Sequence, residues 1–243
     1  MAALIRLPYL SKTNNMKKSV FFAVLAAFML LSVSASAQFT QSKGSSIKGG
    51  SKDVFNTADV TYSPMTLVTD FGLQLKTNLN AVSVNWSQYR NITESTSIYL
   101  QYGAGLQMAW GDFEPILDGA KVTALLVKVP VNVVYKFEIP NTKLTLLPFA
   151  GLNLQGYLLG KGKSTYYDAE GEKITTPFSI FSKEDMGGDR FRRVVLGWQI
   201  GAKLMYDRYF FGLAYDGPVT KLYNKDGLNV KASQVNISLG ITF

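Results

Sequence analysis

Polar and charged side chains that could form ion pairs or line a solute path recur at alternate positions of the chain. Lys128, Asn132 and Lys136 share one face of the segment 125–138, and Gln199 and Lys203 share one face of 194–207. They could line a narrow solute or ion path, or pair with one another in a closed interior, because unpaired buried charge is costly. The candidates for this polar interior are Asp70, Gln74, Lys76, Gln101, Gln107, Lys128, Asn132, Lys136, Glu138, Asn153, Gln155, Gln199, Lys203, Asp207 and Asp216.

The segment 161–190 is a second candidate site, because it is too long for a simple connection and carries charges of both signs. Loops of this length are usually functional or disordered, so a solvated, mobile loop is the alternative. Its carboxylates could suggest calcium, but the twelve-residue pattern of a calcium loop is absent, so we expect no metal site. The candidate residues for binding a partner or a surface glycan are Tyr166, Tyr167, Asp168, Glu170 and Glu172.

The chain of 243 residues contains no cysteine and no histidine. Without cysteine there is no disulfide, zinc-thiolate site or thiol nucleophile. Without histidine there is no Ser-His-Asp triad, imidazole base or histidine metal site. We therefore expect neither an enzyme nor a bound cofactor.

The elements that must position these residues have a period of two, which is typical of half-buried strands. In the last segment Val235, Ile237, Leu239, Ile241 and Phe243 alternate with small or polar residues. No amphipathic helix of comparable strength occurs, so the pattern predicts an all-β fold, an eight-stranded antiparallel up-and-down barrel whose closure removes exposed edges. The predicted strands are 66–77, 81–90, 97–111, 122–138, 143–160, 191–207, 209–217 and 233–243, with a first hairpin through 78–80.

Alternation alone does not decide whether the apolar face points inward, as in a soluble barrel, or outward, as in a transmembrane barrel. Ten residues at about 3.3 Å each, tilted by about 40°, span about 25 Å, the height of an outer-membrane apolar band. Bulky and aromatic side chains lie on the apolar face and glycines on the polar one. Short connections after the second, fourth and sixth strands alternate with longer ones, as periplasmic turns alternate with extracellular loops. These features favour the membrane barrel.

The first 37 residues have the pattern of a cleaved secretory signal peptide. Basic residues at Lys17 and Lys18 precede the apolar run 20–31, and Ala35 and Ala37 place the cleavage site before Gln38. Met16 is an alternative start, with residues 1–15 ahead of it. Removal of 1–37 leaves 21 basic (25 − 4) and 17 acidic residues, a net charge of +4, so we expect no nucleic-acid partner. Residues 38–65 are rich in Ser, Gly, Lys and Thr, which predicts a flexible periplasmic lead-in, with a short strand near 54–62 as an alternative. Residues 66–243 are predicted to form the barrel.

Several segments, in this order, resemble the small bacterial outer-membrane β-barrel proteins of the OmpA/OmpX and PorT-like type, often called the porin family. They are 126–137 with its embedded proline, 148–151, the hairpin 195–215 and the terminal alternating strand. The resemblance implies insertion in the outer membrane of a Gram-negative envelope. It also implies that Leu239, Ile241 and Phe243 form the signal that the barrel-assembly machinery reads.

The expected function is that of a structural or interaction protein whose barrel sits in outer-membrane lipid and whose loops contact an extracellular or envelope partner. Two alternatives stay open: a small channel or porin-like transporter, and an accessory component of a secretion or envelope machine. Fold alone does not choose among them.

Overall fold

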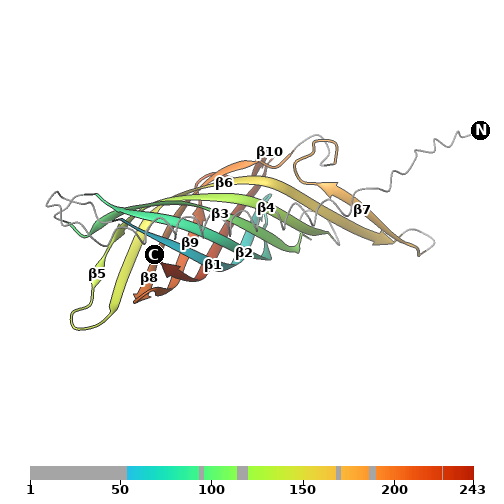
Figure 1. The fold of residues 1–243 in the computed structure, drawn as a ribbon. Helices are drawn as coiled ribbons and strands as arrows, with labels where there is room; N and C mark the ends of the chain where they lie inside the picture. The colour runs from blue at the N-terminus through green and yellow to red at the C-terminus, as the bar shows by residue number, and fades with distance from the viewer. Residues whose placement is uncertain (1–53, 93–95, 114–119, 168–170, 186–189, 226) are drawn as a thin grey trace, which may run out of the picture. The chain divides into compact units, whose positions relative to one another are not determined.

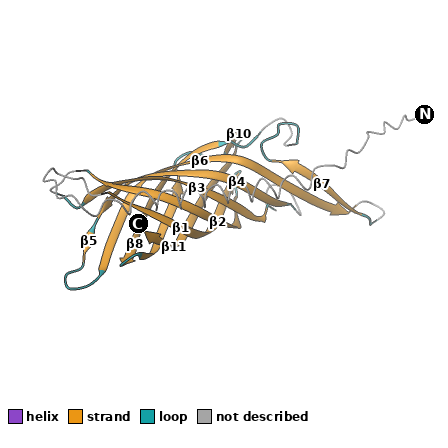
Figure 2. Cartoon of the chain, viewed as in Figure 1, coloured by secondary structure: helices purple, strands orange, loops and turns teal. Residues whose placement is uncertain are grey.

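A computed structural model of the chain describes residues 54–92, 96–113, 120–167, 171–185, 190–225 and 227–243. Within these ranges the regular secondary structure is entirely β (Figures 1 and 2). The long strands are β1 (Val54–Asp70), β2 (Gln74–Asn91), β3 (Ile98–Asp112), β4 (Lys121–Tyr135), β6 (Leu144–Tyr167), β8 (Val194–Tyr206), β9 (Tyr209–Pro218) and β11 (Leu228–Thr242). The short ones are β5 (Phe137–Glu138), β7 (Lys173–Ser179) and β10 (Tyr223–Lys225).

The eight long strands of the described ranges form a closed antiparallel ring, which confirms the predicted fold class. Each pairs with its neighbour in chain order, and β1 pairs with β11 over most of its length and closes the ring. β5 and β7 add to β6, and β10 adds to β11. We call the end where β1 begins and β11 ends the terminal end, and the opposite end the loop end. Among the described residues, no helix has the length and hydropathy needed to cross a membrane.

The register of the ring sets the tilt of its strands. Starting at Asp59 and stepping from each residue to its cross-strand partner, one can go around the ring in either direction and reach β6. One direction arrives at Gln155 and the other at Thr145, so the ring closes with a stagger of ten residues (155 − 145). The first route passes Asn85, Gly105 and Lys128, and the second Gly240, Phe210 and Met205. A stagger of ten residues over eight strands corresponds to a tilt of about 40°, within the range of transmembrane barrels.

Side chains alternate between the two faces of every long strand, and the inner face is the polar one. On β1, Thr57, Asp59, Thr61 and Ser63 are buried, whereas Val60 between them is more than half exposed. Exposed bulky apolar side chains occur on all eight strands, for example Val60, Val82, Leu100, Val131, Leu152, Ile200, Leu213 and Ile237. The ring therefore has an apolar exterior and a polar middle.

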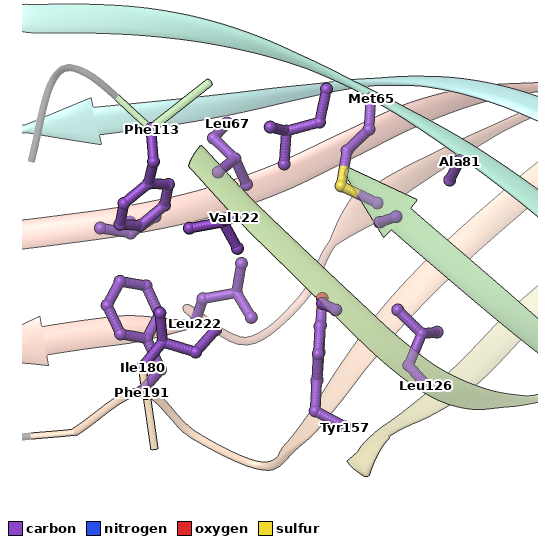
Figure 3. Close-up of a cluster of buried hydrophobic side chains, with 14 of the residues drawn as sticks. Met65, Leu67, Ala81, Phe113, Val122, Leu126, Tyr157, Ile180, Phe191 and Leu222 are labelled. Atoms are coloured by element: carbon purple, nitrogen blue, oxygen red, sulfur yellow. The ribbon is translucent and has the colours of Figure 1, made fainter. Parts of the chain in front are cut away.

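Two apolar clusters fill the interior on either side of the polar middle. The cluster near the loop end, which we call the loop-end plug, contains Leu67, Val122, Leu126 and Tyr157 from the strands and Ile180, Phe181, Phe191 and Leu222 from the connections (Figure 3). The cluster near the terminal end, the terminal-end plug, contains Tyr89, Tyr99, Val134, Leu147 and Phe149. Phe55 stacks on Tyr89 there, with ring centroids 4.5 Å apart.

The predicted position of the first strand is wrong. The segment 66–77 covers the end of β1, a tight turn at 71–73 and the start of β2, and residues 78–80 lie within β2. The ring begins at Val54, so residues 54–65 belong to the barrel and not to a flexible lead-in. The first hairpin is short, but it turns at Gly72, whose φ of 94° suits glycine. The predicted alternation holds for the last three connections, which are long between β6 and β8, a tight turn between β8 and β9, and longer again between β9 and β11, but the connections on either side of β4 are equal in length.

Candidate functional site

The centre of the interior holds two ion pairs between side chains from different sides of the ring. Lys128 on β4 pairs with Asp216 on β9. Lys203 on β8 pairs with Asp59 on β1, with Nζ 3.5 Å from Oδ2. The side chains of Lys203 and Asp59 are 8% and 5% exposed, so the charges compensate one another in a site shielded from solvent. The two ion pairs therefore occupy the centre of the barrel interior with balanced charge.

Side-chain amides surround each ion pair. Gln234 Nε2 donates to Asp216 Oδ2 at 2.8 Å and to Asn236 Oδ1 at 3.0 Å. Gln107 donates across the interior to Gln234 Oε1 at 3.0 Å. Around the other pair, Asn85 Nδ2 donates to Asp59 Oδ1 at 2.7 Å. Each ion pair is thus held by hydrogen bonds from several strands, whereas the buried oxygens Asp216 Oδ1 and Gln199 Oε1 accept none.

The space left inside this network is small. A cavity of about 60 Å³ lies among Asp59, Lys128, Gln199 and Lys203. A second one, of about 20 Å³, lies beside Asp216 and Gln234. These volumes suit a few water molecules rather than a metabolite. Among the described residues, the loop-end plug lies on one side of this polar middle and the terminal-end plug on the other.

The structure brings only part of the predicted polar interior together. Lys128, Gln199 and Lys203 are buried in it, with Gln101, Gln107, Asn132 and Asn153. Lys136 lies at the terminal end, where its Nζ is 2.9 Å from Glu138 Oε1 and 5.9 Å from the Tyr99 ring centroid. Its partner Glu138 is on the exposed β5 and is not an interior residue.

Four further assignments to the interior are wrong. Asp70 is at the loop-end tip of β1, where its Oδ1 accepts a hydrogen bond from Gly72 N. Gln74 and Lys76 are exposed on β2, and Lys76 lies on its outer face. Asp207 is exposed in the turn between β8 and β9, with a φ of 54°. The first three errors follow from the misplaced first strand, and the fourth from extending alternation into a turn.

Sequence reasoning missed Asp59, the carboxylate that pairs with Lys203. Asp59 falls in the predicted lead-in 38–65. The residues before it are rich in Ser, Gly and Thr, and the residues that alternate with it are only moderately apolar. The alternation of Val60 and Tyr62 with Asp59, Thr61 and Ser63 was the available signal.

The partner-binding candidates Tyr166, Tyr167 and Glu172 lie on a β-hairpin formed by the end of β6 with β7. Beyond Lys163, β6 pairs with β7 and no longer with β4, so the hairpin extends past the neighbouring strands (Figure 1). Tyr167 is 70% exposed and Tyr166 51%. Asp168 and Glu170 lie outside the described residues. As consecutive strand residues, Tyr166 and Tyr167 expose one aromatic side chain on each face of the protruding hairpin, where either could contact another molecule.

The remaining predicted sites are the assembly signal at the end of β11 and the signal-peptide cleavage site. Leu239 and Ile241 point outward on β11, and Phe243 has the same alternate phase. Ala35, Ala37 and Gln38 lie outside the described residues. Within the described residues, no three acidic side chains gather into a group that could hold a metal ion.

No protein-family model matches this sequence, and no curated protein has significant sequence similarity to it. Among solved structures, the chain is similar to the attachment invasion locus protein Ail of Yersinia pestis, with 12% identity and a TM-score of 0.43 over 79% of this chain and 99% of that one. It is similar to Neisserial surface protein A, with 10% identity and a TM-score of 0.40 over 79% and 99%. It is also similar to the outer membrane protein OprG of Pseudomonas aeruginosa, with 10% identity and a TM-score of 0.38 over 81% and 99%. At 10–12% identity, these three likenesses concern the fold alone.

Proposed function

We propose that this chain is an integral outer-membrane protein whose closed barrel anchors an exposed hairpin for contact with an extracellular or envelope partner. The observation that carries the proposal is the inversion of the usual burial pattern. Bulky apolar side chains are exposed on all eight described strands of the ring, while charged side chains are buried in its middle. A soluble monomer rarely exposes a contiguous apolar surface of this extent.

The exposed apolar surface has the height of a bilayer. On β4 the outward residues run from Tyr135 through Val133, Val131, Val129 and Val127 to Leu125. Ten residues at about 3.3 Å and a tilt of about 40° give about 25 Å, which matches an outer-membrane apolar band. Aromatic residues mark both borders, with Trp110 near the loop end and Tyr206 and Tyr209 at the terminal end.

The closed interior favours an anchoring role over the channel alternative. An eight-stranded ring is just wide enough for side chains to fill it, and here two apolar plugs flank the ion pairs. We propose a non-catalytic role, because the chain lacks the histidine and cysteine side chains of the common catalytic sites. Partner contact is assigned to the β6–β7 hairpin, since it carries Tyr166 and Tyr167 beyond the ring.

The proposal is tested first by fractionation and heat-modifiability on a semi-native gel. We expect the chain in outer-membrane fractions, with a band that migrates faster unboiled than boiled. A soluble chain without such a shift would contradict membrane insertion.

Orientation and partner contact are tested with single cysteines, which report unambiguously because the natural chain has none. Tyr167→Cys should react with a membrane-impermeant maleimide on intact cells. Arg208→Cys, in the terminal-end turn, should react only after the outer membrane is opened. The reverse labelling would place the hairpin in the periplasm and remove the proposed extracellular contact.

The channel alternative is tested by planar-bilayer recording of the purified chain. We expect no stable ohmic steps, because the interior is closed on both sides of the polar middle. Reproducible steps of constant conductance would favour the channel.

A further inference from the structure

A cluster of basic side chains lies directly above the apolar exterior at the loop end of β4 and β6. On β4 the outward series continues from Leu125 to Thr123 and Lys121. On β6 it continues from Leu159 to Lys161 and Lys163, all exposed. The lysines of β6 point outward because the glycines that alternate with them face the interior. Gly160 lies against Ile180 and Phe181, and Gly162 lies against Phe178. We call Lys121, Lys161 and Lys163 the basic border cluster.

Two members of the cluster face each other across the sheet. Lys121 and Lys163 are direct cross-strand partners, and Lys161 is opposite Thr123, the next outward residue of β4. Like charges directly opposite each other destabilise a sheet. Asp112 Oδ1 is 3.9 Å from Lys121 Nζ, but with side chains 62% and 82% exposed this ion pair contributes little. An anion between the two ammonium groups would remove the repulsion.

A further cation, Arg193, lies where β6 parts from β8, but it does not share the face of the cluster. Arg193 Nη1 donates to the carbonyl oxygen of Leu158, an exposed residue at the upper border of the apolar exterior, at 3.4 Å. Its guanidinium also lies 4.8 Å from the ring centroid of Phe181. Because Phe181 lies on the inner side of β6, against Gly160, these contacts hold the guanidinium at the edge of β6 and not on the outward face that carries Lys161.

The height of the cluster corresponds to a lipid headgroup layer. Lys161 follows Leu159 by two residues, about 5 Å along the barrel axis at 3.3 Å per residue and a tilt of about 40°, and the backbones of Lys121 and Lys163 lie about 10 Å along it, beyond Leu125 and Leu159. The headgroup layer adds about 5 to 8 Å beyond the hydrocarbon on each side. Long lysine side chains adjust their ammonium groups within such a layer while their stems cover apolar surface.

We infer that the basic border cluster binds the phosphate groups of a phosphorylated lipid in the outer leaflet. The inference rests on the proposed function, because it needs the apolar exterior to be embedded in lipid. The acyl chains would cover the outward leucines of β4 and β6, and one phosphate would bridge Lys121 and Lys163. Recognition would combine charge with apolar contact, which distinguishes a lipid from free phosphate.

The test uses the full mature chain, folded in dodecyl maltoside and titrated with diphosphoryl lipid A. The readout is the temperature at which the heat-modifiable band converts to the unfolded band. We expect lipid A to raise this temperature for the wild type. The variant K121Q/K161Q/K163Q should need at least tenfold more lipid for the same rise.

A matched variant removes three exposed basic residues at the terminal end, R90Q/K143Q/R208Q, and should respond like the wild type. Dephosphorylated lipid A and inorganic phosphate at equal concentration should each give no rise. A rise with inorganic phosphate alone would indicate a free-anion site, and an equal rise with dephosphorylated lipid would show that phosphate is not recognised. Either result would overturn the inference.

Failure of the inference is distinguishable from failure of the proposed function. If the wild type gives no heat-modifiable band, the transmembrane barrel itself is wrong and the inference falls with it. If the band is present but the cluster variant responds to lipid A like the wild type, only the inference is wrong.

Discussion

Lys203 on β8 reaches Asp59 on β1 across two strands that both carry glycine on their inner face at this level. Gly212 of β9 is the cross-strand partner of Lys203, and Gly240 of β11 is the partner of Asp59. A Cβ on Gly212 would lie 3.2 Å from Lys203 Cγ, and one on Gly240 would lie 2.7 Å from Asp59 Cβ. The two glycines therefore leave the space that the lysine stem occupies over the Phe210 ring, with Nζ 4.4 Å from its centroid.

Replacement of one partner of this ion pair should destabilise the barrel strongly. Lys203→Met leaves the Asp59 carboxylate buried without its cation, which typically costs about 3–5 kcal/mol. We expect a correspondingly lower urea midpoint in detergent micelles, followed by tryptophan fluorescence. The double variant K203M/D59L should recover much of the loss, because it buries no charge. A single variant as stable as the wild type would show that the pair contributes nothing.

The second prediction compares a glycine-to-alanine substitution at Gly212, beside the Lys203 side chain, with the same substitution at Gly156. Gly212→Ala should destabilise by about 1–3 kcal/mol, because the methyl group overpacks the contact with Ser238 and Lys203. Gly156→Ala is the matched control, since a Cβ there meets nothing within 4 Å. The control should be neutral or slightly stabilising, as reduced freedom of the unfolded chain favours alanine. Equal urea midpoints for the two variants would contradict the packing argument.

The strand pattern was predictable from sequence wherever one face is strongly apolar. On β4 and β11, Val, Ile and Leu alternate with Lys, Asn or Ser, so position and facing could both be read. The first half of β1 was not predictable in the same way. Ala58 is the outward residue there, and Asn56, in the same phase, is buried, so the contrast between the two faces is weak.

The interior network was predictable only in composition. Which lysine meets which aspartate depends on the stagger of the ring, because Lys203 and Asp59 are 144 residues apart (203 − 59) and lie on strands that are not neighbours. Alternation places a side chain inside but does not give the depth of a strand relative to others across the ring. The basic border cluster was not predictable because Lys121, Lys161 and Lys163 lie just outside the predicted strands 122–138 and 143–160, whereas β4 begins at Lys121 and β6 runs to Tyr167.

Whether the outward side chains of β8 contact lipid can be tested by introducing a charge at two of these positions. Ile200 lies at the middle of the strand, and Leu204 lies two residues from its end. Ile200→Arg should cost about 2–4 kcal/mol if the middle of β8 lies at the bilayer midplane, whereas Leu204→Arg should cost about 0–1 kcal/mol near the interface. The measurement is reversible urea unfolding in lipid vesicles. A fully tolerated arginine at Ile200 would mean that this face does not meet lipid.

The last prediction concerns Phe243, which closes the ring together with Asn56. Phe243 N donates to Asn56 O at 3.0 Å, and Asn56 N donates to Phe243 O at 2.9 Å, so the terminal residue ends the seam between β11 and β1. Phe243→Ser keeps these backbone bonds but removes the aromatic end of the predicted assembly signal. We expect less heat-modifiable barrel in outer-membrane fractions at unchanged synthesis. Val60→Ser is the control, because it removes an exposed apolar side chain from β1 without touching the terminus. If both variants lower the assembled barrel equally, the effect belongs to lost lipid contact, and Phe243 has no separate role as a signal.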